Sequence, residues 1–176
     1  SKRRYSFTEA ANIVYLSLQD INPVFARQFK DFLHSGQIDV FPRQGKVLGN
    51  RSSISNLSEP IFVLLNFTGD PADILNLGHD FGHVLGNKAL QKNQTNEFYI
   101  PSSPAIAEAE GIFWEYAVMD KLMEEASSDE KFILLRQKLG SNINKIFRQI
   151  TFYQFEQALH DTFRTHGEIS GNTIDE

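Results

Sequence analysis

The segment from residue 70 to residue 86 constrains the fold of this chain most strongly. It opens with Asp70-Pro71-Ala72-Asp73, where a capping residue, a proline at the first helical position and an acid in the first turn predict the start of a helix. Gly86 is the predicted end of that helix. Residues four apart lie about 40° apart around a helix axis, so His79 and His83 can direct both imidazoles at one point. The segment therefore predicts a helix that offers two ligands to a single ion.

A third ligand must come from elsewhere in the chain. The 176 residues include no cysteine, so disulfides and thiolate ligands are excluded and a transition metal would rest on His, Asp and Glu. A catalytic zinc usually takes three protein ligands. A helix predicted from Ser103-Pro104 to about Glu125 carries a stripe that is apolar except for two glutamates: Ala105, Glu108, Ile112, Glu115, Met119 and Leu122. Carboxylates in such a stripe are costly unless they are paired or bind metal, so Glu108 is the best third-ligand candidate. Glu115, two turns further on, is a candidate to support a histidine N–H.

Two other interpretations of these residues stay open. Histidines four apart often occur by chance on exposed helix faces, and Asp73, Asn76 and Asp80 share this side, as they would on an ordinary solvated face. Glu108 and Glu115 could equally be paired with Lys or Arg from a neighbouring helix. The remaining histidines show no partner pattern and are interpreted as surface or satisfied side chains: His34, His160 and His166.

Most of the remaining sequence is predicted to be helical. Ser6 followed by Glu9 is a capping-box pattern that opens a first helix, which extends to about Leu18. Further helices are expected over about residues 23–33, 129–139 and 141–166. In the last of these, four apolar side chains recur at helical spacing, which favours core packing over a cofactor pocket: Phe152, Phe155, Leu159 and Phe163.

The section between residues 37 and 67 has a different character. Residues 60–67, PIFVLLNF, form a short run of β-forming residues closed by Thr68-Gly69, which predicts a strand. Its expected partner is the stretch of residues 47–55. The predicted fold class is therefore mainly α, with a helical body and a small β-sheet or hairpin beside the metal-binding helix.

Composition excludes several classes of partner. A hydrophobic content of 41% with 15 Phe favours a globular fold, and a net charge of -5 with mixed signs argues against nucleic-acid binding. The longest apolar runs are far shorter than the roughly 20 residues that span a bilayer, so no membrane partner is expected. The basic start SKRR does not lead into the apolar region of a signal peptide, and a cytoplasmic location is the expectation.

Several stretches resemble the thimet oligopeptidase and oligoendopeptidase F family of zinc metallopeptidases. In that family His-Glu-x-x-His is followed, 25 residues after the second histidine, by a glutamate ligand on the next helix, and Glu108 stands at that spacing from His83. AEAEGIFWE, residues 107–115, resembles the family's ligand helix, with both glutamates placed alike. IDVFPRQGK followed by PIFVLLNFTG resembles its glycine-rich passage and the next strand, and KIFRQITFYQFEQALH is similar to a late helix. The resemblance covers nearly the whole chain.

The resemblance implies a zincin-like catalytic core that hydrolyses short peptides through a zinc-activated water. One Zn²⁺ would be bound by three residues: His79, His83 and Glu108. Asp80, the acid after the first histidine, would be the general base, and Glu115 would support a ligand. The strand of residues 61–67 would border the cleft, where an edge strand can pair with extended peptide backbone.

The sequence departs from the family pattern at three points. Asp80 replaces the family's glutamate, which moves the carboxylate back by roughly 1.5 Å and is expected to weaken turnover more than metal binding. Gly78 and Gly86 replace an alanine and a histidine often found in the family, which is expected to relax the helix. The family's helical N-terminal lobe is missing, and its tyrosines and histidine that steady the reaction intermediate lie beyond the point where this chain ends, at Glu176.

The prediction is accordingly a single metallopeptidase-like core domain over residues 1–176 that lacks the family's N-terminal lobe and C-terminal segment. One alternative is a catalytically weakened or inactive zinc- or peptide-binding module derived from such a peptidase. Another is a fragment of a longer enzyme, and a first residue of Ser instead of Met is typical of a processed or subcloned piece. Homo-oligomerisation is one way to replace part of the missing substrate-enclosing wall.

Overall fold

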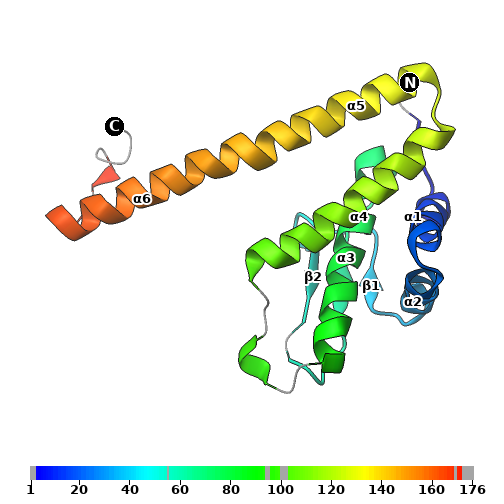
Figure 1. Ribbon diagram of the computed structural model, residues 1–176, viewed down its shortest axis with the longest axis horizontal. Helices are drawn as coiled ribbons and strands as arrows, with labels where there is room; N and C mark the ends of the chain where they lie inside the picture. Colours follow the sequence, from blue (N-terminus) through cyan, green and yellow to red (C-terminus); the bar gives the residue numbers. More distant parts are fainter. Residues whose placement is uncertain (1–2, 55, 94–95, 100–102, 169, 172–176) are drawn as a thin grey trace. The chain divides into compact units, whose positions relative to one another are not determined.

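The computed structural model describes residues 3–54, 56–93, 96–99, 103–168 and 170–171, which are mainly helical with one small sheet (Figure 1). This confirms the predicted fold class. The chain divides into two compact units, residues 1–125 and 126–176. The single catalytic-core domain stays a prediction. Within the described residues, no helix is long and apolar enough to cross a membrane.

The helices of the first unit are α1 (Phe7–Ile21), α2 (Pro23–His34), α3 (Pro71–Asn93), α4 (Pro104–Glu125) and the short 3₁₀ turn η1 (Glu97–Tyr99). The predicted capping box of α1 is confirmed. The Ser6 backbone N–H donates to the Glu9 carboxylate, and the Glu9 backbone N–H donates to the Ser6 hydroxyl. These reciprocal bonds satisfy two donors that the first helical turn leaves free.

The start of α3 is also as predicted, but its end is not. Asp70 Oδ1 accepts from the backbone N–H of Ala72 at 3.2 Å, and Asp73 Oδ2 accepts from that of Thr68 at 2.7 Å. The predicted end at Gly86 is wrong, because α3 continues to Asn93. Gly86 is not among the glycines with positive φ, so it does not provide the left-handed turn that ends many helices.

The sheet has three strands in the order β1-β3-β2. β1 (Ile38–Asp39) is parallel to β3 (Phe62–Leu64), and β2 (Arg51–Ser53) is antiparallel to it. The predicted pairing of residues 47–55 with the strand of residues 60–67 is confirmed at β2, while Ser55 lies outside the described residues. β3 is therefore the central strand, with its buried residues alternating along Ile61, Val63, Leu65 and Phe67.

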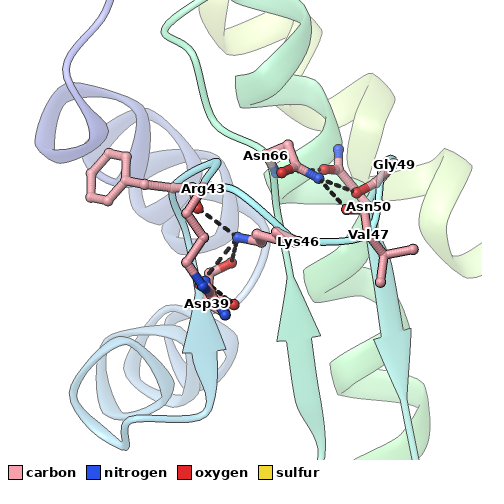
Figure 2. A network of polar contacts seen from close by, with 8 residues as sticks. Asp39, Arg43, Lys46, Val47, Gly49, Asn50 and Asn66 are labelled. Atoms are coloured by element: carbon pink, nitrogen blue, oxygen red, sulfur yellow. Dashed lines mark hydrogen bonds and ion pairs between the residues drawn. The ribbon is translucent and has the colours of Figure 1, made fainter.

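The loop between β1 and β2 is bonded to β1 and to the residues that follow β3 (Figure 2). The Lys46 side chain is 1% exposed, and its Nζ donates to the backbone carbonyls of Asp39 at 3.1 Å and Phe41 at 2.8 Å. Asn66, which follows β3, donates through Nδ2 to the carbonyl of Gly49 at 2.7 Å. Because β2 follows directly, these bonds determine where its first residues lie.

The second unit consists of consecutive helical segments, α5 (Ser128–Ile143), the π-helical turn η2 (Asn144–Arg148) and α6 (Gln149–His166). The predicted break between residues 139 and 141 is wrong, since α5 passes through Gly140. Within this unit alone, the aromatic stripe of α6 does not form the predicted core: Phe152, Phe155 and Phe163 are exposed and Leu159 is half-buried. Helical segments that follow one another along the chain cannot bury an apolar face without another element against it.

Candidate metal centre

The helices α3 and α4 lie side by side, with their backbones close together (Figure 1). Glycines spaced four apart on α3 permit this approach. A Cβ atom at Gly78 would lie 2.6 Å from Val118 Cγ2, and one at Gly82 would lie 2.8 Å from the carbonyl oxygen of Glu110. Gly78 was expected to relax the helix, but its contact with α4 makes it a packing position.

The three predicted ligands come together where these two helices meet. One potential ligand atom from each of His79, His83 and Glu108 lies within 4.8 Å of the others, and His79 Nε2 is 3.5 Å from Glu108 Oε2. Two ligand atoms that are each about 2.1 Å from a tetrahedral zinc lie about 3.4 Å apart. The donor types and their spacing therefore fit one zinc ion. Among the described residues, this is the one such group of His, Asp and Glu side chains.

Glu115 contacts the other nitrogen of the His79 ring. Its Oε2 lies 3.3 Å from His79 Nδ1, and both side chains are less than one-fifth exposed. A carboxylate beside Nδ1 favours a proton there and leaves the Nε2 lone pair free for a metal. Glu108 and Glu115 thus contact His79 at its two nitrogens.

His83 and Gly111 are the other residues that shape the candidate metal group. Burial, followed by the charge of His79, lowers the pKa of His83, which favours the neutral imidazole that binds metals. The His79 ring lies against the backbone of α4, where a Cβ atom at Gly111 would be 2.6 Å from Nε2. Sequence reasoning missed Gly111, because the steric need for a glycine arises only when α4 packs against this ring.

Asp80 is buried, with 4% of its surface exposed, so the interpretation of its side as an ordinary solvated face is wrong for this residue. The pKa of Asp80 is raised to about 7, chiefly by burial; the charge of His79 opposes this rise and that of Glu108 adds to it. Among the described residues, no hydrogen bond to its carboxylate is found. A carboxylate with a pKa near neutrality can exchange a proton at physiological pH.

A pocket of about 360 Å³ adjoins the group. Its walls come from β2 and the residue after it, from α3 and from α4: Ser52, Ser53, Ile54, His83, Asn87, Ala107, Glu108 and Glu110. The prediction that the strand of residues 61–67 borders the cleft is wrong. β3 is paired on both sides, whereas β2 is an edge strand of the sheet and lines the pocket.

Glu110 is a pocket residue that sequence reasoning did not identify. Its carboxylate lies over Gly86, so closely that a Cβ atom at residue 86 would overlap it. Burial raises the pKa of Glu110. The residue stands outside the apolar stripe that identified Glu108 and Glu115, so no helical periodicity marks it. The only sequence signal was a second acid two residues from a candidate ligand.

Two histidines of one helix and a glutamate of the next, beside an edge strand, form an arrangement typical of metallopeptidase cores. The family model described as peptidase family M3 matches residues 8–176. The chain belongs to this family.

Individual relatives agree with that assignment. The chain is 27% identical over 167 residues to the chromosomal oligoendopeptidase F of Lactococcus lactis subsp. cremoris, covering 94% of this chain and 27% of the relative. It is 24% identical over 161 residues to oligopeptidase PepF of Bacillus subtilis (strain 168), covering 89% of this chain and 23% of the relative. The chain thus spans about a quarter of the length of these relatives.

The fold is also similar to a solved structure. A crystal structure of a protein assigned as a peptidase from Chlamydophila abortus aligns with a TM-score of 0.77 at 26% identity. The alignment covers 98% of this chain and 29% of that one. The arrangement of helices and sheet described above is therefore shared with part of a larger protein.

Proposed function

We propose that this chain is the metal-binding core of a zinc peptidase that hydrolyses short peptides, and that one Zn²⁺ is bound by His79, His83 and Glu108. The observation that carries the proposal is the convergence of these three side chains within 4.8 Å in a member of peptidase family M3. A zinc ion held there would supply a Lewis acid that polarises the scissile carbonyl and lowers the pKa of a water molecule. Glu115 would orient His79 through Nδ1.

Asp80 is the proposed general base. Its carboxylate would accept a proton from the attacking water and transfer it to the leaving amine. Burial supports this role, because it raises the pKa of Asp80 to about 7, close to the pH at which a base must both accept and release a proton. The side chain is one methylene shorter than glutamate, so the proposed reaction is slow.

The free edge of β2 is the proposed binding site for the substrate backbone. β2 lines the pocket next to His83 and Glu108 and pairs with β3 on one side. An edge strand offers unpaired N–H and C=O groups that an extended peptide can join. A cytoplasmic location and homo-oligomerisation remain part of the proposal.

Metal analysis tests the proposal directly. After zinc loading and desalting, elemental analysis should find about one zinc per chain, and His83→Ala should abolish binding. His160→Ala is the matched control, since that histidine is exposed on α6, outside the candidate group. A wild-type protein that remains metal-free after loading would contradict the proposed zinc site.

A second candidate function is a zinc- or peptide-binding module without turnover. Asp80 favours it, because the residue is buried and is not among the side chains that line the pocket. Cleavage of fluorogenic peptides by the zinc-loaded protein separates the two functions. Measurable cleavage that is lost in Asp80→Asn supports the peptidase, whereas binding without cleavage supports the module.

A further inference from the structure

We propose that Glu110 binds a cationic group of the peptide and so gives the pocket a preference for peptides with a positive charge near the bond to be cleaved. The inference rests on the proposed peptidase function and deepens it. The cationic group is the side chain of a lysine or arginine, or the ammonium of a free N-terminus.

The position of the Glu110 carboxylate depends on Gly86 of α3, the helix packed against α4. A Cβ atom at Gly86 would lie 2.6 Å from Glu110 Cδ and 2.8 Å from Oε1, so the carboxylate occupies space that any other residue at position 86 would fill. On the same helix, Gly82 allows α3 to approach the backbone carbonyl of Glu110. The carboxylate is thereby held against the α3 backbone, and Glu110 lines the pocket together with Asn87 of α3.

Glu110 has no partner for its charge within the described part of the chain. Neither a hydrogen bond nor an ion pair to its carboxylate is found there. The other carboxylate that lines the pocket, Glu108, belongs to the candidate metal group, whereas Glu110 does not. No Lys or Arg is among the described residues that line this pocket. Once Glu108 binds a metal, Glu110 is the negative charge left to attract a substrate.

The chemistry that fits such a carboxylate is a hydrogen-bonding cation. A partly buried carboxylate is costly without a partner, and charge-assisted hydrogen bonds to ammonium or guanidinium groups are among the strongest. The pocket of about 360 Å³ is within the usual size range of ligand pockets, so a lysine or arginine side chain can enter it. Because His83 and Glu110 line the same pocket, the bound cation would lie close to the scissile bond.

The test compares fluorescein-labelled peptides that differ in one residue, lysine or its uncharged analogue norleucine, each with a free or an acetylated N-terminus. Anisotropy with zinc-loaded protein measures binding, and cleavage is followed separately. The wild type should bind the lysine peptide about fivefold to tenfold more tightly than the norleucine peptide with the same N-terminus. Glu110→Gln should reduce this ratio to about one. If acetylation weakens binding of both peptides instead, and Glu110→Gln removes that difference, the bound cation is the N-terminus.

Two further variants sharpen the result. Glu125→Gln removes an exposed carboxylate from the same helix and should keep the wild-type ratio. Gly86→Ala keeps the carboxylate but displaces it, and should lower the ratio if its position matters. Peptide binding with no preference for charge, or a preference that survives in Glu110→Gln, would overturn the inference and leave the peptidase proposal intact. Failure to bind or cleave any of the peptides would overturn both.

Discussion

His79 Nδ1 lies 3.3 Å from Glu115 Oε2, on the side of the ring away from the nitrogen that faces Glu108. This contact predicts that Glu115 acts on zinc through His79. Glu115→Ala should weaken zinc binding by about 10- to 100-fold, as replacement of such supporting carboxylates usually does. Competition with a chromophoric chelator measures the affinity, with Glu125→Ala as the control on the same helix. Equal affinities in both variants would argue against this role.

The length of the Asp80 side chain should limit turnover. Asp80→Glu restores the missing methylene and should raise kcat on a fluorogenic peptide, by up to about 100-fold. Zinc content should not change, because Asp80 is not part of the candidate metal group. If both proteins bind zinc and peptide but neither cleaves, the zinc- or peptide-binding module is the better description.

Burial of Asp80 should make the metal-free protein less stable as the pH rises. The pKa of Asp80 is about 7 in the folded protein against an ordinary value of 3.8, so the folded state retains the proton more strongly. Its contribution to stability is full below about pH 4 and is lost as the pH rises through about 7. Urea unfolding in the presence of EDTA, between about pH 5 and pH 8, should show this loss in the wild type and not in Asp80→Asn.

The test compares the free energy of unfolding of the wild type with that of Asp80→Asn at each pH. The lowered pKa of His83 acts in the opposite direction, since stability is lost as the pH falls below the ordinary value of 6.5. Asp80→Asn retains that histidine, so subtraction isolates the carboxyl group. A difference that does not vary with pH would contradict the raised pKa.

Two glycine-to-alanine substitutions should differ in their effects. Gly111→Ala places a Cβ atom 2.6 Å from the His79 ring and should lower both the free energy of unfolding and the zinc affinity. Gly140→Ala has open space around it within α5 and should be neutral or stabilising, by up to about 1 kcal/mol, because alanine favours helices. Thermal unfolding and chelator competition test the pair. Similar effects in both would contradict the steric explanation.

The buried ammonium group of Lys46 should hold the neighbouring loop and β2 in place. Lys46→Met keeps much of the apolar side chain but removes the bonds to the Asp39 and Phe41 carbonyls (Figure 2). Amide hydrogen exchange over residues 47–53 should therefore become faster. Lys131→Met, at an exposed site on α5, is the control and should leave this exchange unchanged.

Several features of the fold could be predicted from local sequence. The capping box of Ser6 and Glu9, and the start of α3 at Asp70-Pro71, depend on hydrogen bonds within a few residues, so a short window contains the necessary information. The four-residue spacing of His79 and His83 similarly requires only that their segment be helical. These signals, with Glu108 on the following helix, were sufficient to propose the three residues that converge in the structure.

Other features depended on contacts between distant segments. Gly86 is the residue type that often ends a helix, yet α3 continues to Asn93, and this glycine packs against the Glu110 carboxylate of α4. Asp80 appeared to belong to a solvated face and is buried, and β2 instead of the strand of residues 61–67 lines the pocket. A local pattern specifies which backbone conformation is favoured. Burial, edge position and the pairing of Gly86 with Glu110 depend on which surfaces meet when α3, α4 and the sheet pack together.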